Sequence, residues 1–121
     1  MDWASPATEE AKAAATNADA EAEAAAGRSV PLMLSFTITD MSGRNLSGHT
    51  VEAFWHSVRH ARPVTIGLNC SFGAEQLRPH VQLLAKLADT LVMVYPNAGL
   101  PNELGEYDEE PDTTAALVKA W

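Results

Sequence analysis

From Val30 onward, three short runs of apolar, β-prone residues alternate with three segments of helical periodicity. This alternation limits the fold more than any other feature, because strand-helix-strand units pair their strands in parallel with right-handed crossovers. The apolar runs lie at residues 31–39, 64–68 and 90–95. The first is almost continuous in apolar and β-prone residues, so we expect a strand buried on both faces. The sequence therefore predicts an α/β fold with a parallel sheet.

Each apolar run is followed by a loop and then by a segment that is typical of a helix. The first helix is expected to begin after Thr50, whose hydroxyl can cap it, and to end near Arg62, before Pro63. Its apolar residues have the i, i+3, i+4, i+7 spacing of one buried face: Val51, Phe54, Trp55 and Val58. The later helices have apolar residues at Leu77, Val81, Leu84 and Ala88, and at Leu117, Val118 and Trp121. Each strand therefore has a helix that can cover it.

Residues 1–27 differ from the rest in composition, because Ala, Glu, Asp and Thr dominate them. Trp3 is the only large apolar side chain there after Met1, so this low-complexity acidic segment offers little surface to bury. Ala and Glu favour a helix, but a helix without an apolar stripe is marginal in water. We therefore expect residues 1–27 to be a disordered or frayed helical segment that precedes one domain at residues 28–121.

The formal net charge of −8 argues against a surface for nucleic acid or for anionic membranes, since both depend on clustered Lys and Arg. No stretch approaches the roughly 20 consecutive apolar residues of a membrane span, and the N-terminus lacks the basic and apolar regions of a signal peptide. We expect a cytoplasmic protein. Its one cysteine, Cys70, excludes an internal disulfide.

Asp40, Cys70 and Asn97 each follow one of the apolar runs, together with Pro, Asn and Gly residues. In α/β folds, sites are built at the carboxyl ends of the parallel strands. Cys70 could be a metal thiolate or a nucleophile, although a lone cysteine is more often a small buried side chain. Asp40 could bind a substrate ammonium group or cap its loop, and Asn97 could bind a substrate or belong to a rigid turn. The residues alone leave these alternatives open.

His56 and His60 are four residues apart on the first predicted helix, a spacing that also occurs in zinc sites. The Glu that follows the first His in the metalloprotease motif is absent, and the apolar residues occupy the opposite side of this helix. We interpret the pair as solvated surface histidines.

Six short blocks of the sequence resemble the homocysteine S-methyltransferase family, in order and at the family's spacing. They lie at residues 36–40, 42–44, 46–48, 67–70, 95–102 and 105–108. The similarity is greatest to the cobalamin-dependent methionine synthase branch, covers about residues 28–121, and leaves the acidic segment outside. It implies a partial (β/α)8 TIM barrel of about three βα units, since a complete barrel takes about 250 residues.

The resemblance also implies a metal and a substrate. In this family, zinc held by three cysteine thiolates activates homocysteine for methyl transfer. Cys70 falls on the first of these ligands, whereas the Cys-Cys pair that supplies the other two is not in the sequence. Asp40 and Asn97 fall where the family contacts the amino-acid end of homocysteine. One thiolate cannot fix a zinc ion that needs three protein ligands and an open position for the substrate sulfur.

Two hypotheses of function follow. In the first, the chain is a fragment of such an enzyme, whose parent reaction transfers a methyl group from methylcobalamin to homocysteine and gives methionine. The remaining barrel and the cobalamin and folate domains would then be its partners, and this chain alone should be inactive. In the second, the chain is a non-catalytic remnant that acts as an interaction module, since three parallel strands without barrel closure leave two unpaired edges.

Overall fold

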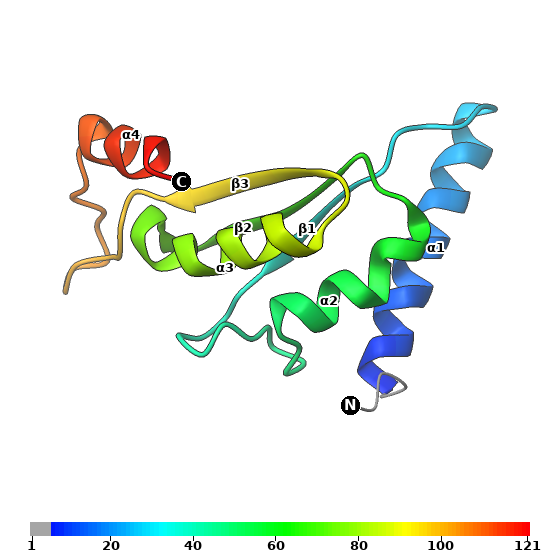
Figure 1. Ribbon diagram of the computed structural model, residues 1–121, viewed down its shortest axis with the longest axis horizontal. Coiled ribbons are helices and arrows are strands. Elements are labelled where there is room, and N and C mark those ends of the chain that lie inside the picture. The colour runs from blue at the N-terminus through cyan, green and yellow to red at the C-terminus, as the bar shows by residue number, and fades with distance from the viewer. Residues whose placement is uncertain (1–5) are drawn as a thin grey trace.

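A computed structural model of the chain describes residues 6–121, apart from the side chains of residues 6–8, 10, 11, 70 and 71. Strands and helices alternate in it along the chain (Figure 1). They are α1 (Pro6–Ala26), β1 (Met33–Thr37), α2 (Val51–Val58), the 3-10 helix η1 (Arg59–Ala61), β2 (Thr65–Gly73), α3 (Ala74–Leu87), β3 (Leu91–Asn97) and α4 (Pro111–Lys119). None of the helices within residues 6–121 has the length and apolar character that crossing a membrane requires.

The three strands form one parallel sheet in the order β1-β2-β3. Phe36 of β1 is paired with Leu68 of β2, which is paired in turn with Val94 of β3. The strands therefore point the same way, and their carboxyl ends meet at one edge of the sheet (Figure 1). This confirms the predicted α/β fold with parallel strands and alternating helices. Within the described residues the sheet is open, as part of a barrel would be.

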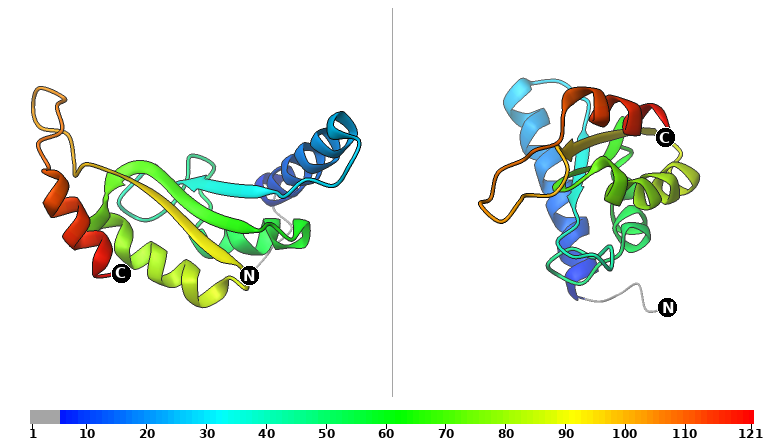
Figure 2. Two further views of the ribbon diagram at one scale, coloured as in Figure 1. Left: turned by 90° about the horizontal axis from the view of Figure 1, so that it is seen from above. Right: turned by 90° about the vertical axis from the view of Figure 1, so that its left-hand side faces the viewer.

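The core lies between one face of the sheet and the helices α2 and α3, which cover that face (Figure 2). α2 begins as predicted, because the backbone N–H of Ala53 donates to the Thr50 hydroxyl at 3.2 Å. The buried apolar side chains of this layer are Phe36, Ile38, Ile66 and Leu68 from the β1 and β2 segments, Val51, Trp55 and Val58 from α2, and Leu77, Val81 and Leu84 from α3. The apolar faces that the helical spacing predicts for α2 and α3 are therefore the faces that are buried.

The opposite face of the sheet has no helix over it in the described part of the chain (Figure 2). Burial alternates along β1, where Phe36 is 3% exposed but Met33 is 54% exposed. On β3, Leu91 and Tyr95 are likewise exposed. The prediction that the first strand is buried on both faces is wrong, because every second side chain of a strand lies on the same face and this face is uncovered.

The helix α1 lies beside α2 (Figure 1). Ala15 is only 5% exposed and belongs to the core cluster. The Thr16 hydroxyl lies 3.0 Å from Nε2 of His60 in η1, which links α1 to the end of α2. The helices before and after β1 are therefore neighbours, as they are in the outer layer of a (β/α) barrel. The predicted division of the chain into a segment at residues 1–27 and a domain at residues 28–121 stays a prediction.

The first testable prediction concerns Gly67, which lies within β2 where β3 comes very close. A Cβ atom on Gly67 would lie 2.1 Å from the backbone oxygen of Met93 in β3. Because a paired strand backbone cannot rotate away as a side chain can, Gly67→Ala should lower the free energy of unfolding by about 1–3 kcal/mol. Chemical denaturation measures this loss.

The matched control for that experiment is Gly105→Ala. A Cβ atom at Gly105 meets no heavy atom within 4 Å, although its φ of 81° is unfavourable for alanine. This variant should therefore lose only about 1 kcal/mol, from backbone strain alone. A Gly67→Ala protein as stable as the wild type would show that β2 and β3 are not in the contact described above.

A second prediction concerns the contact between α1 and α2. Ala15→Glu places a charge at a buried position while keeping a residue that favours helix, so α1 should detach from α2. Limited proteolysis within α1 should then be faster by roughly an order of magnitude. Ala14→Glu is the control, because Ala14 is exposed in the same helix. Equal cleavage rates in both variants would mean that α1 does not pack on α2.

Candidate functional site

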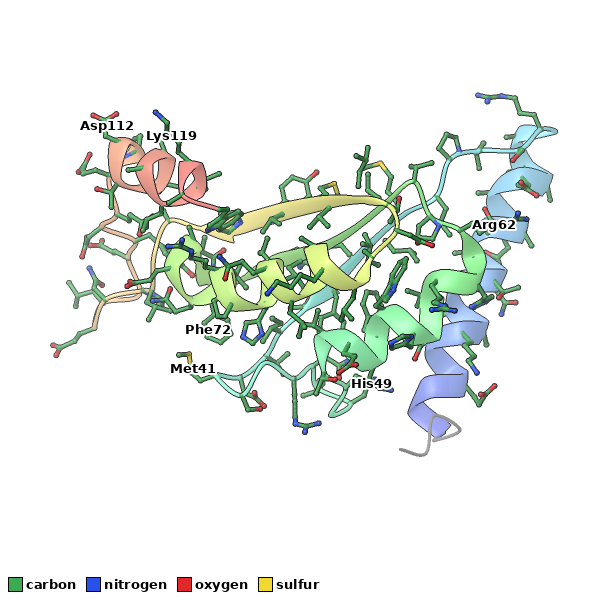
Figure 3. The ribbon with its side chains drawn as sticks, viewed as in Figure 1. Met41, His49, Arg62, Phe72, Asp112 and Lys119 are labelled. Atoms are coloured by element: carbon green, nitrogen blue, oxygen red, sulfur yellow. The ribbon has the colours of Figure 1, made fainter. Side chains whose placement is uncertain are left out.

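The residues that the sequence analysis selects lie at the carboxyl edge of the sheet. Asp40 follows β1, Cys70 lies in the last part of β2, and Asn97 is the last residue of β3. In Figure 3 Met41 and Phe72, which neighbour this edge on the β1 and β2 sides, lie left of the centre of the view, and Arg62 lies on the right. The parallel order of the strands therefore brings three separate segments to one edge, as predicted.

β2 is longer than its sequence pattern predicts, and its last part is irregular. The apolar run ends at residue 68 and a loop is expected after it, but the strand continues to Gly73. Asn69 pairs with Tyr95, and the next pair is Gly73 with Asn97, so three residues of β2 face Pro96 alone. Pro96 has no backbone N–H to donate to β2, which explains why regular pairing stops there. Such bulges are frequent beside active sites.

The backbone of Cys70 lies within this bulge. Its side chain lies outside the described residues, so its assignment as a metal ligand stays a prediction. What the backbone contributes is the location: Cys70 directly follows the regular pair of Asn69 and Tyr95, at the end of the middle strand of the sheet.

The loop after β3 folds back onto the end of β2. A Cβ atom at Gly73 would be 2.6 Å from the Cα atom of Gly99, so glycine is needed for the two backbones to approach. Gly99 itself has a φ of 79°, which favours glycine at that position as well. This contact holds the segment that follows Asn97 against the bulge that contains Cys70.

A network of polar side chains connects β1 and β2 on the uncovered face of the sheet. The hydroxyls of Ser35 and Thr37 donate to Oδ1 of Asn69 at 2.7 and 3.1 Å, and Nδ2 of Asn69 lies 2.9 Å from Oγ1 of Thr37. No motif in the sequence points to these residues. A signal for them exists, since Ser35 and Thr37 occupy alternate positions of a strand and must share a face. The network fixes the side chain that immediately precedes Cys70.

Asp40 organises the loop that follows β1. Its Oδ1 atom accepts hydrogen bonds from the backbone N–H of Ser42 at 2.8 Å, from the Ser42 hydroxyl at 2.5 Å, and from the backbone N–H of Arg44 at 3.4 Å. The Ser42 hydroxyl bond, supported by the backbone bonds and the Arg44 charge, lowers the pKa of Asp40, so the carboxylate is ionised at neutral pH. Asp40 therefore caps its loop through Oδ1, which is the structural alternative that the sequence leaves open.

The same loop rests on α3. A Cβ atom at Gly43, whose φ is 79°, would lie 2.3 Å from Cε1 of His80, so the loop backbone packs directly on the imidazole. Burial lowers the pKa of His80, because desolvation disfavours the charged ring. Contact with a helix from the second βα unit gives the Asp40 loop a fixed position relative to β2.

Asn97 is partly buried at the end of β3, and its Nδ2 atom lies 3.4 Å from the hydroxyl of Tyr107. Tyr107 belongs to the long loop between β3 and α4, which extends beyond the carboxyl end of the sheet (Figure 2). Asn97 is predicted from the sequence as a site residue, whereas Tyr107 is not. A contact over ten residues of irregular loop has no periodicity from which it could be predicted.

A cavity of about 340 Å³ lies between β1 and the loop that follows it. It is lined by Ser35, Phe36, Thr37, Thr39, Asn45, Leu46, His49 and Phe54. Phe36 and Phe54 stack within this lining with ring centroids 4.5 Å apart. A second cavity, of about 390 Å³, lies between the end of α1 and the amino ends of the strands. We take the first as part of the candidate site, because it adjoins the carboxyl edge of the sheet.

The structure gives no support to a zinc site at His56 and His60. Both ring nitrogens of His60 have protein partners, since Nδ1 lies 3.0 Å from the backbone oxygen of Ser57 and Nε2 lies 3.0 Å from the Thr16 hydroxyl. Among the residues that the structure describes, no three His, Cys, Asp or Glu side chains are grouped to hold a metal ion. His60 therefore has a structural role between helices.

The sequence model of a protein family, described as homocysteine S-methyltransferase, matches residues 4–121 of the chain. The match includes α1, whereas the resemblance carried by the short blocks leaves the acidic segment outside. This agrees with the position of α1 beside α2, where it continues the layer of helices.

The hydrogen bonds of the Asp40 loop make a testable prediction. Ser42→Ala removes the hydroxyl donor, so the pKa of Asp40 should rise toward its ordinary value. Because the pKa of Asp40 is lowered in the folded chain, its carboxylate stabilises the loop above the ordinary pKa, and this contribution is lost as the pH falls through the lowered pKa. NMR titration of the Asp40 carboxyl carbon measures both values. Ser47→Ala is the control in the same loop, and an identical shift in both variants would contradict the assignment.

Proposed function

Because the chain belongs to the homocysteine S-methyltransferase family, we propose that it forms part of the homocysteine site of a cobalamin-dependent methionine synthase. The parent reaction would transfer a methyl group from methylcobalamin to homocysteine and give methionine in the cytoplasm. In this proposal Asp40 and Asn97 bind the amino-acid end of homocysteine, and Cys70 is one of three thiolate ligands of zinc. The remaining barrel and the cobalamin and folate domains are the partners of the chain.

The observation that carries this proposal is the convergence of the three segments at one edge of the sheet. Asp40 follows β1, Cys70 lies in the last part of β2 and Asn97 ends β3, and parallel pairing brings these three parts of the sheet to one edge. Two contacts between segments support the arrangement: the approach of Gly99 to Gly73, and the bonds of Ser35 and Thr37 to Asn69. Positioning by several strand ends is what methyl transfer to a bound thiol requires.

Two groups of the chain suit the ammonium group of a free amino acid. Asp40 uses Oδ1 within its loop, and its lowered pKa keeps the carboxylate ionised, so an ammonium group would meet a negative charge at this exposed position. Oδ1 of Asn97 is a further acceptor for ammonium protons, because Nδ2 already faces Tyr107. These two groups bind and orient the substrate but cannot activate its sulfur.

The described residues do not supply a complete zinc site. The proposal therefore requires two further ligands from outside this chain, with Cys70 as the one that this chain contributes. When zinc is bound, it favours the thiolate form of a coordinated thiol. A thiol without it is mostly protonated at neutral pH, which is why we expect this chain alone to be inactive.

A second candidate function is an interaction module without catalysis. The uncovered sheet face supports it, since Met33, Leu91 and Tyr95 are 54%, 73% and 57% exposed there. Large exposed apolar side chains on one face are typical of a surface that a partner covers. The two functions predict different results for a completed barrel: methyl transfer if the chain is part of an enzyme, and binding of the other segments without methyl transfer if it is an interaction module.

The test is methyl transfer from methylcobalamin to homocysteine, assayed with the purified chain and again after co-expression with the missing upstream and downstream barrel segments. We expect no turnover by the chain alone and zinc-dependent turnover by the completed barrel. Within the completed barrel, Cys70→Ser should reduce kcat by at least about 100-fold, because an incomplete ligand set no longer holds the metal.

His56→Ala is the matched control, since His56 is a possible metal-binding side chain that the proposal does not use. It should leave turnover and zinc content of the completed barrel unchanged. A completed barrel that binds its segments tightly but transfers no methyl group would favour the interaction module. Turnover by the chain alone would contradict the requirement for ligands from outside it.

A further inference from the structure

The long loop between β3 and α4 is organised around one side chain, Asn102. Its Oδ1 atom accepts hydrogen bonds from the backbone N–H groups of Leu104 and Glu106, both at 2.9 Å. Its Nδ2 atom donates to the carboxylate of Asp108 at 2.8 Å. The backbone N–H of Asn102 also donates to the backbone oxygen of Glu106 at 2.8 Å. Asn102 therefore holds both neighbours of Tyr107 in place.

Two further contacts fix this loop where it joins α4 and β3. The Thr114 hydroxyl donates to Oε1 of Glu109 at 2.5 Å, which ties the end of the loop to the first turn of α4. Glu109 also lies against Gly99, since a Cβ atom at Gly99 would be 3.1 Å from Oε2 of Glu109. These contacts close the loop on itself. The bonds of Asn102 to the residues on either side of Tyr107 then hold Tyr107 in its position.

In the structure Tyr107 lies beside the nitrogen of the Asn97 side chain, which leaves the oxygen of that side chain available to a ligand. The Tyr107 hydroxyl lies 3.4 Å from Nδ2 of Asn97 and accepts a hydrogen bond from it. A carboxamide that donates on one side must present its oxygen on the other, and this oxygen is an acceptor only. An ammonium group offers donors only, so it is recognised by this orientation and not by the flipped one.

We propose that Tyr107, held by Asn102, is a positioning residue that orients the Asn97 carboxamide to accept a hydrogen bond from the α-ammonium group of the substrate. This inference rests on the proposed function, because it takes homocysteine as the ligand of Asn97. It adds a determinant of specificity: the site distinguishes an α-amino acid thiol from the same thiol without its amino group. Tyr107 does not touch the reacting sulfur in this account.

The first experiment tests the orientation without any ligand. In a ¹⁵N-labelled chain, the side-chain amide protons of Asn97 are identified by their loss in Asn97→Asp. Tyr107→Phe and Asn102→Ala should both shift these signals and speed their exchange with water, because the acceptor is removed or released. Tyr95→Phe is the control, since the Tyr95 hydroxyl bonds to Sδ of Met93 instead. Unchanged Asn97 signals in Tyr107→Phe would overturn the inference.

The second experiment tests the specificity with two probes, reduced L-homocysteine and 4-mercaptobutyrate, which lacks the amino group. Both are titrated into the wild-type chain and into Tyr107→Phe, with binding followed by NMR. In Tyr107→Phe the Kd for L-homocysteine should rise about threefold to tenfold, the effect of one lost hydrogen bond, while the Kd for 4-mercaptobutyrate stays the same.

The outcomes separate the inference from the proposed function. An equal change for both probes, or no change for either, would overturn the role of Tyr107 while leaving homocysteine binding intact. If the wild-type chain binds neither probe, homocysteine binding by this chain is contradicted, and the substrate role of Tyr107 fails with it. A normal fold of Tyr107→Phe is checked by its backbone amide spectrum, which should match the wild type outside residues 97–108.

Discussion

Parallel pairing of β2 with strands on both sides is the constraint on which the candidate site depends. It sends the ends of β1, β2 and β3 to one edge, and the close approach of Gly67 to Met93 keeps the middle strand tightly against β3. At that edge the regular pairing stops opposite Pro96, and β2 bulges where Cys70 lies. Up to Asn69, β2 pairs regularly with β1 on one side and β3 on the other, and this pairing holds it in the sheet. Its last residues can therefore bulge out of the regular pattern without disrupting the sheet.

The fold could be predicted largely from local patterns. Apolar runs and the helical spacing of Val51, Trp55 and Val58 depend on residues close together in the chain. The structure has strands and helices in these segments, although β2 continues beyond its apolar run. Two features could not be read in this way. The uncovered face of β1 depends on what else packs on the sheet, and the position of α1 depends on a few contacts such as Ala15, whose sequence context is uniformly small and polar.

The candidate site also has parts that local sequence patterns predict and parts that they do not. Asp40 and Asn97 are found from their places after strands, and the structure puts both at the carboxyl edge. The bonds that give them a direction come from other segments: Ser42 and Arg44 to Asp40, and Tyr107 to Asn97. Such bonds depend on the conformation of loops, and a loop conformation produces no periodic pattern of residue types from which it could be predicted. The proposed role of Cys70 as a metal ligand rests on its place in the chain and on the family to which the chain belongs, and the structure adds only that its backbone lies in the bulge of β2.

Cobalt substitution tests the central claim, that this edge of the sheet contributes Cys70 to the metal and homocysteine site of a methyltransferase. Co²⁺ replaces zinc in the barrel completed by co-expression, and the absorption band of thiolate-to-cobalt charge transfer is recorded. The account predicts a strong band that weakens in Cys70→Ser, keeps its intensity in His56→Ala, and shifts when homocysteine is added. A band of full intensity in Cys70→Ser, or one that disappears in His56→Ala, would contradict it.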